Sequence, residues 1–184
     1  MTDVPAGETP VATSAAGPLP VDELASRVAA AYPDVVVARD EVTIVVDREA
    51  LRDCLTWLRA DPALQLGFLS CVTATDHPGA EPRVWVIYEL RSIERRHRMR
   101  VKVGLIEGDL QVPTIVDLFP TADWQEREVF DFYGVTFDGH PDLTRILLPD
   151  DWEGFPLRKD EELGGVNTRY VGAFIPPIDE RGMA

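Results

Sequence analysis

The sequence is poor in cysteine and has neither a long apolar run nor a glycine-rich nucleotide motif. Its two cysteines, Cys54 and Cys71, fall in a helical and a strand-like pattern, so neither a disulfide framework nor an iron–sulfur cluster, which needs grouped thiolates, is expected. No Gly-x-Gly-x-x-Gly opens a helix after a strand, which argues against a resident dinucleotide or flavin. No apolar run approaches the roughly 20 residues that cross a bilayer, so any membrane association is expected to be indirect.

Positive charge is scarce as well. The 184 residues carry 18 Lys and Arg against 32 Asp and Glu, a formal net charge of −14, which argues against broad nucleic-acid binding. Residues 1–20 are rich in Ala, Pro, Thr and Gly, and they lack the basic start and apolar core of a signal peptide. We expect them to form a flexible tail outside the fold, because they offer little apolar surface to bury.

Apolar periodicity predicts a two-layer α+β domain over residues 21–112. The second helix has the clearest pattern, because Leu51, Cys54 and Leu58 lie at i, i+3 and i+7. The predicted order is helix-β-β-helix-β-β-β, with a mixed sheet and both helices packed on one face. The expected elements are a helix between Asp22 and Pro33, a helix between Asp47 and Asp61, and strands at 35–38, 42–46, 66–75, 83–90 and 96–105.

A further helix and a long extended C-terminal segment are expected over residues 113–160. Asp123 and Glu126 suggest a capping box at the start of this helix, and Gly134 suits its end. Beyond Gly134 regular structure is expected to run out, because prolines interrupt the pattern. The large apolar residues that follow then need another cover, and a partner protein is expected to provide it: they are Ile146, Leu147, Leu148, Trp152, Phe155 and Leu157. No mode of docking is predicted for the C-terminal tail, residues 161–184.

The same part of the chain resembles a family signature. It reads EREVFDFYG at 126–134, GHPDL at 139–143, DWEG at 151–154 and PLRKD at 156–160. In this order the motifs resemble the 30 kDa subunit family of NADH-quinone oxidoreductase, respiratory complex I. The strand region 84–103 is similar to that family in pattern.

The resemblance implies a hydrophilic subunit of the peripheral arm, attached at the cytoplasmic side of the cell membrane. It further implies a cofactor-free chain that holds neighbouring subunits together, chiefly subunits D and B, which are the quinone-site subunit and the cluster-bearing subunit. FMN, Fe-S clusters and quinone then belong to other subunits of the translocase. A similar subunit of a membrane-bound hydrogenase, or of an oxidoreductase with another electron donor, is the alternative. The expected partner contacts are Glu126, Arg127, Glu128, Asp131, His140, Asp142, Arg145, Trp152, Arg158, Lys159 and Asp160.

A stand-alone metal-dependent hydrolase is a more distant alternative, built from Glu126, Glu128, Asp131 and His140. Carboxylates and a histidine can hold a metal or transfer protons. However, Glu126 and Glu128 project about 200° apart around a helix and not onto one target. Arg127 and Asp131, at i and i+4, are expected to form an ordinary surface ion pair.

The three histidines have no metal-ligand spacing. His140 lies between a glycine and a proline, so its ring either satisfies local backbone groups or contacts a partner subunit. His77 and His97 are expected at the surface or in turns.

One concentration of positive charge stands out in this acidic chain. A solvated strand face and a surface for an acidic neighbour are both open readings of it. Nucleic acid is disfavoured, because aromatic residues do not interleave with the cations. The residues concerned are Arg91, Arg95, Arg96, Arg98, Arg100 and Lys102.

Overall fold

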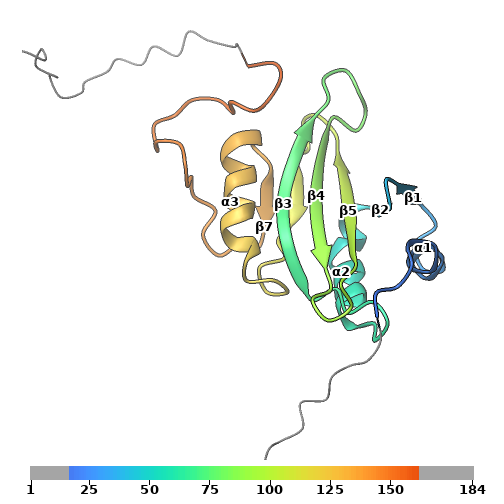
Figure 1. Ribbon diagram of the computed structural model, residues 1–184. Helices are drawn as coiled ribbons and strands as arrows, with labels where there is room; N and C mark the ends of the chain where they lie inside the picture. Colours follow the sequence, from blue (N-terminus) through green and yellow to red (C-terminus); the bar gives the residue numbers. More distant parts are fainter. Residues whose placement is uncertain (1–16, 162–184) are drawn as a thin grey trace, which may run out of the picture.

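The computed structural model describes residues 17–161, in which a five-stranded sheet carries two helices on one face and a third helix beside one edge (Figure 1). The elements follow the predicted order, and the two-layer α+β class is confirmed. Their bounds are α1 (Val21–Ala29), β1 (Val35–Ala38), β2 (Glu41–Val45), the 3-10 turn η1 (Arg48–Ala50), α2 (Leu51–Ala60), β3 (Phe68–Asp76), β4 (Val84–Arg91), β5 (Arg98–Leu105), β6 (Gln111–Pro113), α3 (Ala122–Tyr133) and β7 (Thr136–Asp138).

The sheet has the order β1-β2-β5-β4-β3. Its neighbouring strands are antiparallel except for β2 and β5, which run parallel. β5 is the last of the five strands in the chain, yet it lies in the middle, where Met99 is paired with Val42 on one side and with Leu90 on the other. The two halves of the sheet are therefore joined only through β5.

Burial in the strands follows the period of two that the sequence predicts. In β5, Met99, Val101 and Val103 are buried, while Arg100 and Lys102 lie on the opposite face. The buried side chains of β2, β4 and β3 belong to the same cluster. One face of the sheet therefore forms the core.

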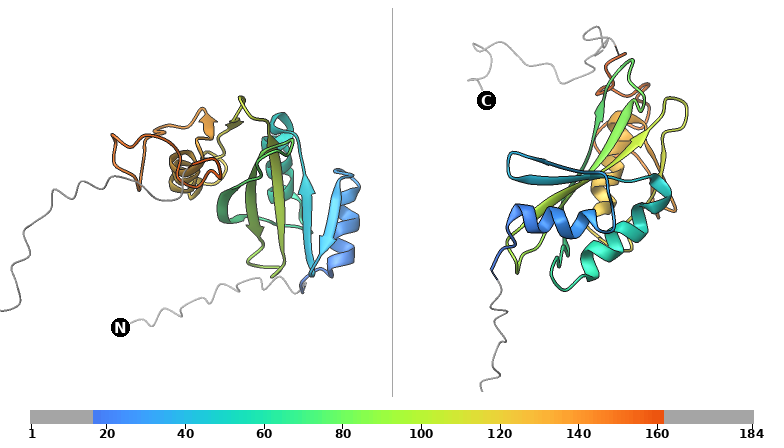
Figure 2. Two further views of the ribbon diagram at one scale, coloured as in Figure 1. Left: turned by 90° about the horizontal axis from the view of Figure 1, so that it is seen from above. Right: turned by 90° about the vertical axis from the view of Figure 1, so that its right-hand side faces the viewer.

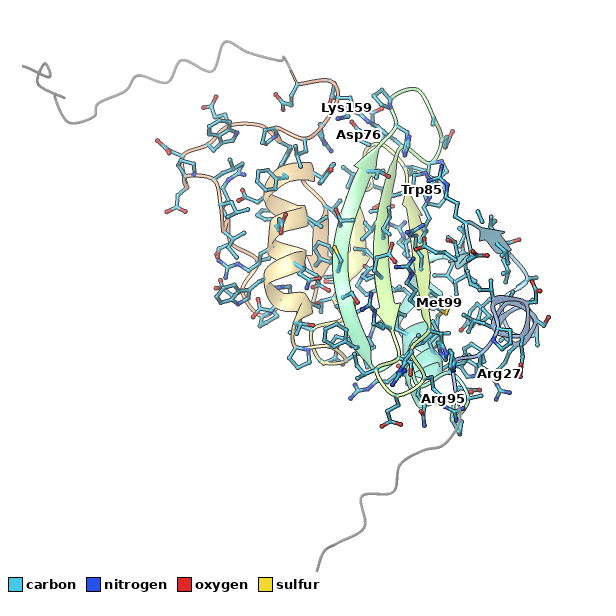
Figure 3. The ribbon with its side chains drawn as sticks, in the orientation of Figure 1. Arg27, Asp76, Trp85, Arg95, Met99 and Lys159 are labelled. Carbon is cyan, nitrogen blue, oxygen red and sulfur yellow. The ribbon has the colours of Figure 1, made fainter. Side chains whose placement is uncertain are left out.

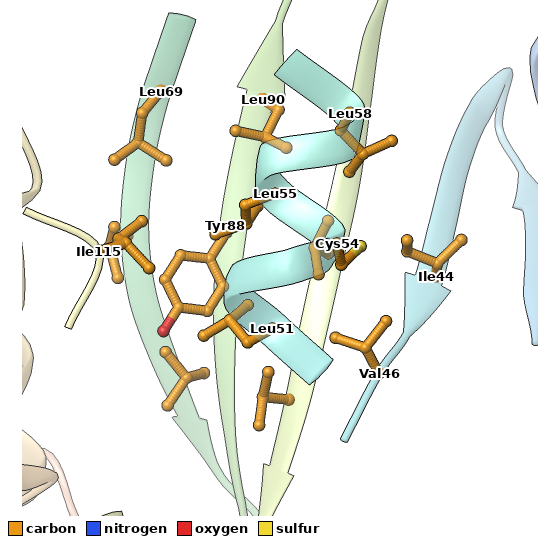
Figure 4. Close-up of a cluster of buried hydrophobic side chains, with 14 of the residues drawn as sticks. Ile44, Val46, Leu51, Cys54, Leu55, Leu58, Leu69, Tyr88, Leu90 and Ile115 are labelled. Atoms are coloured by element: carbon orange, nitrogen blue, oxygen red, sulfur yellow. The ribbon is translucent and has the colours of Figure 1, made fainter. Parts of the chain in front are cut away.

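Helix α2 covers the centre of that face. Its four inward positions, spaced one turn apart, have no solvent exposure: they are Leu51, Cys54, Leu55 and Leu58. Figure 4 shows Leu55 of this helix beside Tyr88 of β4. Leu24 and Val28 of α1 join the same cluster, and the two helices lie on the same side of the sheet (Figure 2). Within residues 17–161 no helix combines the length and apolar character that a bilayer crossing requires.

The second, smaller sheet is a correction to the sequence analysis, which predicts no strand after residue 105. β6 and β7 pair in parallel through Val112 and Phe137, and α3 connects them. Three residues are too few to show a period of two, which explains why the sequence gives no signal for either strand. The expected boundary between residues 112 and 113 falls inside β6.

Helix α3 packs along the free edge of β3. The side-chain carbonyl of Gln125 accepts a hydrogen bond from the backbone N–H of Val72 at 2.5 Å. The helix thereby covers part of a strand edge that would otherwise be open to pairing with another chain. Val129 of α3, Val112 and Phe137 belong to the same buried cluster as the main sheet, so the core is continuous.

Most of the basic row is neutralised within the sheet. The ion pairs are Arg98 with Glu41 at 2.6 Å, Arg100 with Glu41 at 3.2 Å, and Arg100 with Glu89. The ammonium group of Lys102 lies over the ring of Trp85, 4.5 Å from its centroid, and Arg95 donates to the carbonyl of Pro62. The cations on this strand face therefore need no acidic neighbour.

His97 is buried, which contradicts its expected place at the surface. Its Nε2 lies 2.7 Å from the carbonyl oxygen of Leu64, and burial lowers the pKa of the ring. A hydrogen bond to the backbone compensates the burial of this polar ring, so its strand position alone gives no sign of its environment.

Replacing Leu55 by Ala should lower the free energy of unfolding by about 2–5 kcal/mol, because the change leaves a cavity between α2 and the sheet. Urea denaturation of the full chain measures this loss. Thr56→Ala, at an exposed neighbouring position of the same helix, should change stability by less than about 1 kcal/mol. Equal effects of the two substitutions would contradict the proposed position of α2 in the core.

Candidate functional site

Residues 141–160, here called the C-terminal segment, pass along α3 and over its C-terminal end (Figure 1). Buried or half-buried polar groups hold this segment at three places. The first is Asp131 of α3, the second is Arg158 within the segment, and the third is Asp76 at the end of β3.

The carboxylate of Asp131 holds the start of the segment. Its Oδ2 accepts hydrogen bonds from three successive backbone N–H groups, those of Ile146, Leu147 and Leu148, at 3.2, 2.9 and 2.9 Å. Its Oδ1 accepts from the guanidinium of Arg145 at 2.7 Å. Arg145 also donates to the carbonyls of Asp131 itself and of Trp152, so one buried acid organises a complete turn of the chain.

Asp131 is ionised in this setting. Burial alone would raise the pKa of its carboxyl group, but the N–H of Leu148, the Arg145 guanidinium and the two other amides hold that pKa below its usual value. The expected surface pair between Arg127 and Asp131 is absent from the described contacts. Arg127 instead donates to the carbonyls of Thr144 and Arg145, which adds a second support to the same turn.

The second holding point lies at the C-terminal end of α3. Arg158 donates to the carbonyl of Tyr133 at 2.9 Å, and the N–H of Leu157 donates to the carbonyl of Phe132 at 3.2 Å. The ring of Phe155 lies against Gly134, which has φ +73° and would place a Cβ only 2.6 Å from that ring. Gly134 is thus required both for the left-handed end of the helix and for the approach of the aromatic ring.

The third point joins the segment to the main sheet. Asp76 and Arg83 are buried, and the guanidinium of Arg83 donates to the Asp76 carboxylate at 2.8 Å, which lowers the pKa of Asp76. The N–H of Lys159 donates to Asp76 at 2.8 Å, and Asp160 pairs with Arg83 at 2.8 Å. Figure 3 shows Asp76 and Lys159 together at one end of the sheet. Sequence reasoning missed Asp76 and Arg83, because contacts across 83 residues leave no local pattern.

Glu126 fastens α3 to the preceding turn. It is fully buried and accepts hydrogen bonds from the hydroxyl of Thr114 at 2.5 Å and from the N–H of Ile115 at 2.9 Å. The capping box expected from Asp123 and Glu126 is therefore wrong, since the carboxylate is used elsewhere. Burial raises the pKa of Glu126 to about 7, its two hydrogen bonds oppose that shift, and the charges of Asp123 and Asp117 add to it.

The ring of His140 is buried beneath this turn. Its Nδ1 accepts from the N–H of Asp142 at 3.1 Å, and its Nε2 lies 3.2 Å from the carbonyl of Asp123 and 3.9 Å from the carboxylate of Glu126. These contacts assign the neutral tautomer with its hydrogen on Nε2. His140 thus satisfies local backbone groups, which is the first of the two readings of this residue.

Only some of the expected partner contacts are open to a partner. The side chains of Glu126, Asp131 and His140 have no solvent exposure, so direct contact is corrected for these three, which act by positioning the chain. For the half-exposed and exposed residues partner contact stays a prediction: they are Arg127, Glu128, Asp142, Arg145, Trp152, Arg158, Lys159 and Asp160.

The residues of the hydrolase alternative do not converge on one point. Glu126 is buried while Glu128 is exposed, and Asp131 is engaged by Arg145 and three amides. Over the ranges that the structure covers, no three His, Cys, Asp or Glu side chains are grouped so that they could hold a metal ion. The geometry gives this alternative no support.

The apolar side chains of the C-terminal segment stay accessible. Leu147 is 62% exposed and Leu157 is 43% exposed, and Ile146, Leu148, Trp152 and Phe155 are half-buried. Trp124 at the start of α3 is exposed as well. The backbone of the segment is therefore fixed by polar contacts from within, while large apolar groups face outward.

Asp131→Ala should release the start of the C-terminal segment, because it removes the acceptor of three amides and leaves Arg145 without its carboxylate. We expect a loss of about 3 kcal/mol in unfolding free energy and faster hydrogen exchange of the amides of residues 146–148. Glu128→Ala, three residues earlier on the exposed face, is the control and should leave these amides protected. Unchanged exchange in Asp131→Ala would contradict the arrangement.

Glu126→Gln should stabilise the protein relative to the native chain as pH rises. The folded-state pKa of about 7 lies above the ordinary value of 4.5, so the folded form keeps a proton that the unfolded form loses. Stability of the native chain therefore falls between about pH 4.5 and 7, and the neutral amide avoids a loss of up to about 3 kcal/mol. Urea unfolding of both proteins at pH 4.5 and 7.5 measures the difference, and an equal difference at both values would refute the assignment.

The sequence matches a known family over most of the described fold. Residues 44–167 match the family described as respiratory-chain NADH dehydrogenase, 30 Kd subunit. The corresponding subunit of NADH-quinone oxidoreductase from Saccharopolyspora erythraea is 47% identical over 148 residues, which cover 80% of this chain and 59% of that relative. The chain therefore spans less than two thirds of that relative's length.

Two solved structures share the fold. The trypsin-resistant fragment (1-134) of Nqo5 has a TM-score of 0.56 and 32% identity, and the match covers 65% of this chain and 96% of the fragment. A chain of the membrane-bound sulfane sulfur reductase, an archaeal respiratory membrane complex, has a TM-score of 0.65 and 26% identity over 77% of this chain and 85% of that chain. Since the family match extends over more than half of the sequence, the chain belongs to the family of the 30 Kd subunit of respiratory-chain NADH dehydrogenase.

Proposed function

We propose that the chain is the cofactor-free 30 kDa structural subunit of a proton-translocating NADH-quinone oxidoreductase. In this proposal it lies in the peripheral arm on the cytoplasmic side of the cell membrane, and FMN, Fe-S clusters and quinone bind to other subunits. Its contribution to catalysis is to hold those subunits at fixed positions, because electron transfer and quinone reduction depend on distances that a scaffold maintains. Family membership supports the assignment.

The observation that carries the proposal is the construction of the C-terminal segment. Its backbone is pinned by Asp131, Arg158 and Asp76, so its shape is set before any partner arrives. Leu147 and Leu157 project outward from this fixed backbone. A rigid surface with outward apolar side chains is suited to an interface, because little conformational entropy is lost when it binds.

Two neighbours are proposed for this surface, the quinone-site subunit, which would lie against the C-terminal segment, and the cluster-bearing subunit. The charged groups beside the apolar side chains would fix the orientation of the contact. Asp142, Lys159 and Glu128 are exposed around the segment and α3, and polar groups at the rim of an interface give specificity more than affinity.

A related complex with a different electron donor is the second candidate. The similarity to a chain of the sulfane sulfur reductase supports it, because that assembly is also a respiratory membrane complex and its name gives another electron chemistry. No residue of the C-terminal segment contacts a donor in either case, so its geometry fits both. Affinity purification from native membranes, with identification of the co-purified subunits, separates the two: NADH- and FMN-binding subunits support the first candidate.

Leu147→Glu combined with Leu157→Glu should abolish assembly while leaving the fold intact. Both side chains are exposed in the chain itself, whereas in the complex each substitution would bury a charge in place of roughly 1.5–3 kcal/mol of apolar contact. NADH-quinone reductase activity of membranes and recovery of neighbouring subunits should fall by more than about tenfold.

Ile106→Glu is the matched control, since Ile106 is an exposed apolar residue outside the segment. It should leave assembly and activity close to those of the native chain. Full activity of the Leu147/Leu157 variant, together with an unchanged circular dichroism spectrum, would contradict the proposed function.

A further inference from the structure

A second outward surface lies at the turn between β4 and β5. Arg91, at the end of β4, is directly opposite Arg98, at the start of β5. Like charges in that position repel each other, and only Arg98 has an ion pair, with Glu41 at 2.6 Å. Within residues 17–161 the guanidinium groups of Arg91 and Arg96 have no hydrogen bond or ion pair. Arg96 also adopts a left-handed backbone with φ 58°.

Exposed apolar side chains accompany these arginines. Ile93 is 65% exposed and Phe68, at the start of β3, is 45% exposed. Ile93 borders two recesses, which meet at this residue. One, of about 520 Å³, is lined by Asp40, Arg91, Ser92, Ile93, Arg96 and Arg98, and the other, of about 400 Å³, is lined by Arg59, Gln65, Gly67, Phe68, Ile93 and Glu94. We call this area the β4–β5 turn surface.

The β4–β5 turn surface and the C-terminal segment lie at opposite ends of the main sheet. β3 begins at Phe68, beside the turn surface, and ends at Asp76, where Lys159 is bound. A strand of nine residues separates its ends by about 26 Å. Figure 3 shows Arg95 of the turn at one end of the sheet and Asp76 with Lys159 at the other. The sheet therefore acts as a rigid spacer between two accessible surfaces.

We infer that the β4–β5 turn surface binds an acidic segment of a second neighbouring subunit, with carboxylates placed at Arg91 and Arg96 and a large apolar side chain against Ile93. The inference rests on the proposed function. In a chain of net charge −14, two cations without partners beside a directly opposed arginine form a site that an incoming carboxylate relieves of its repulsion.

Peptide chemistry fits this surface better than an anionic lipid surface does. Asp40 and Glu94 line the two recesses, and they would repel a continuous sheet of phosphate groups. Lipid-binding polybasic regions use clusters of about 4–8 cations, more than are free at this turn. A peptide can place its carboxylates at Arg91 and Arg96 and avoid the two acids.

The test is photo-crosslinking in the native complex. A benzophenone-bearing phenylalanine replaces Ile93 in one strain and Leu147 in another, and the captured peptides are identified by mass spectrometry. We expect Ile93 to capture a peptide of another subunit with Asp or Glu within a few residues of the cross-link. Arg91→Glu with Arg96→Glu should lower that yield about tenfold, whereas Arg91→Lys with Arg96→Lys should preserve it.

The two positions make the outcomes distinguishable. Capture at Leu147 without capture at Ile93 would leave the proposed function intact and overturn the inference. Capture of lipid, of a second copy of this chain, or of a peptide without acidic residues at Ile93 would also overturn it, as would a yield insensitive to the charge reversal. Absence of any cross-link to another subunit at both positions would refute the proposed function itself.

Discussion

The arrangement of the C-terminal segment depends on one carboxylate, that of Asp131. A buried charge is costly unless it is fully paired, and this one is paired with three successive amides and one guanidinium. The donors come from residues 145–148, so the acid fixes the backbone without using the apolar side chains there. Those side chains are consequently left free for contact with another protein.

Two kinds of force divide the molecule. Under α2 the fold is held by apolar burial, which is strong but not directional. Around α3 it is held by directional polar contacts, in which Arg145, Arg158 and Glu126 each reach backbone groups of a neighbouring turn. The first fixes a stable sheet, and the second gives an irregular segment one defined shape, as a surface for recognition requires.

Prediction from the sequence succeeded where a period was present. The inward positions of α2 and the alternation in β5 follow from spacing alone, and the family motif located the region of the site. Charged residues are normally exposed, so Glu126 and Asp131 were expected to face a partner, and their burial reverses that. Contacts such as Lys159 with Asp76 join residues far apart in the chain, and neither composition nor periodicity carries a trace of them.

The central position of β5 has a consequence for how the chain acquires its structure. The hairpin of β1 and β2 and the hairpin of β3 and β4 share no ladder of their own. During synthesis they remain separate until residues 98–105 leave the ribosome and insert between them. Because closure must bring together segments distant in sequence, folding of this sheet is a late and comparatively slow event, and the surfaces at its two ends come into being together.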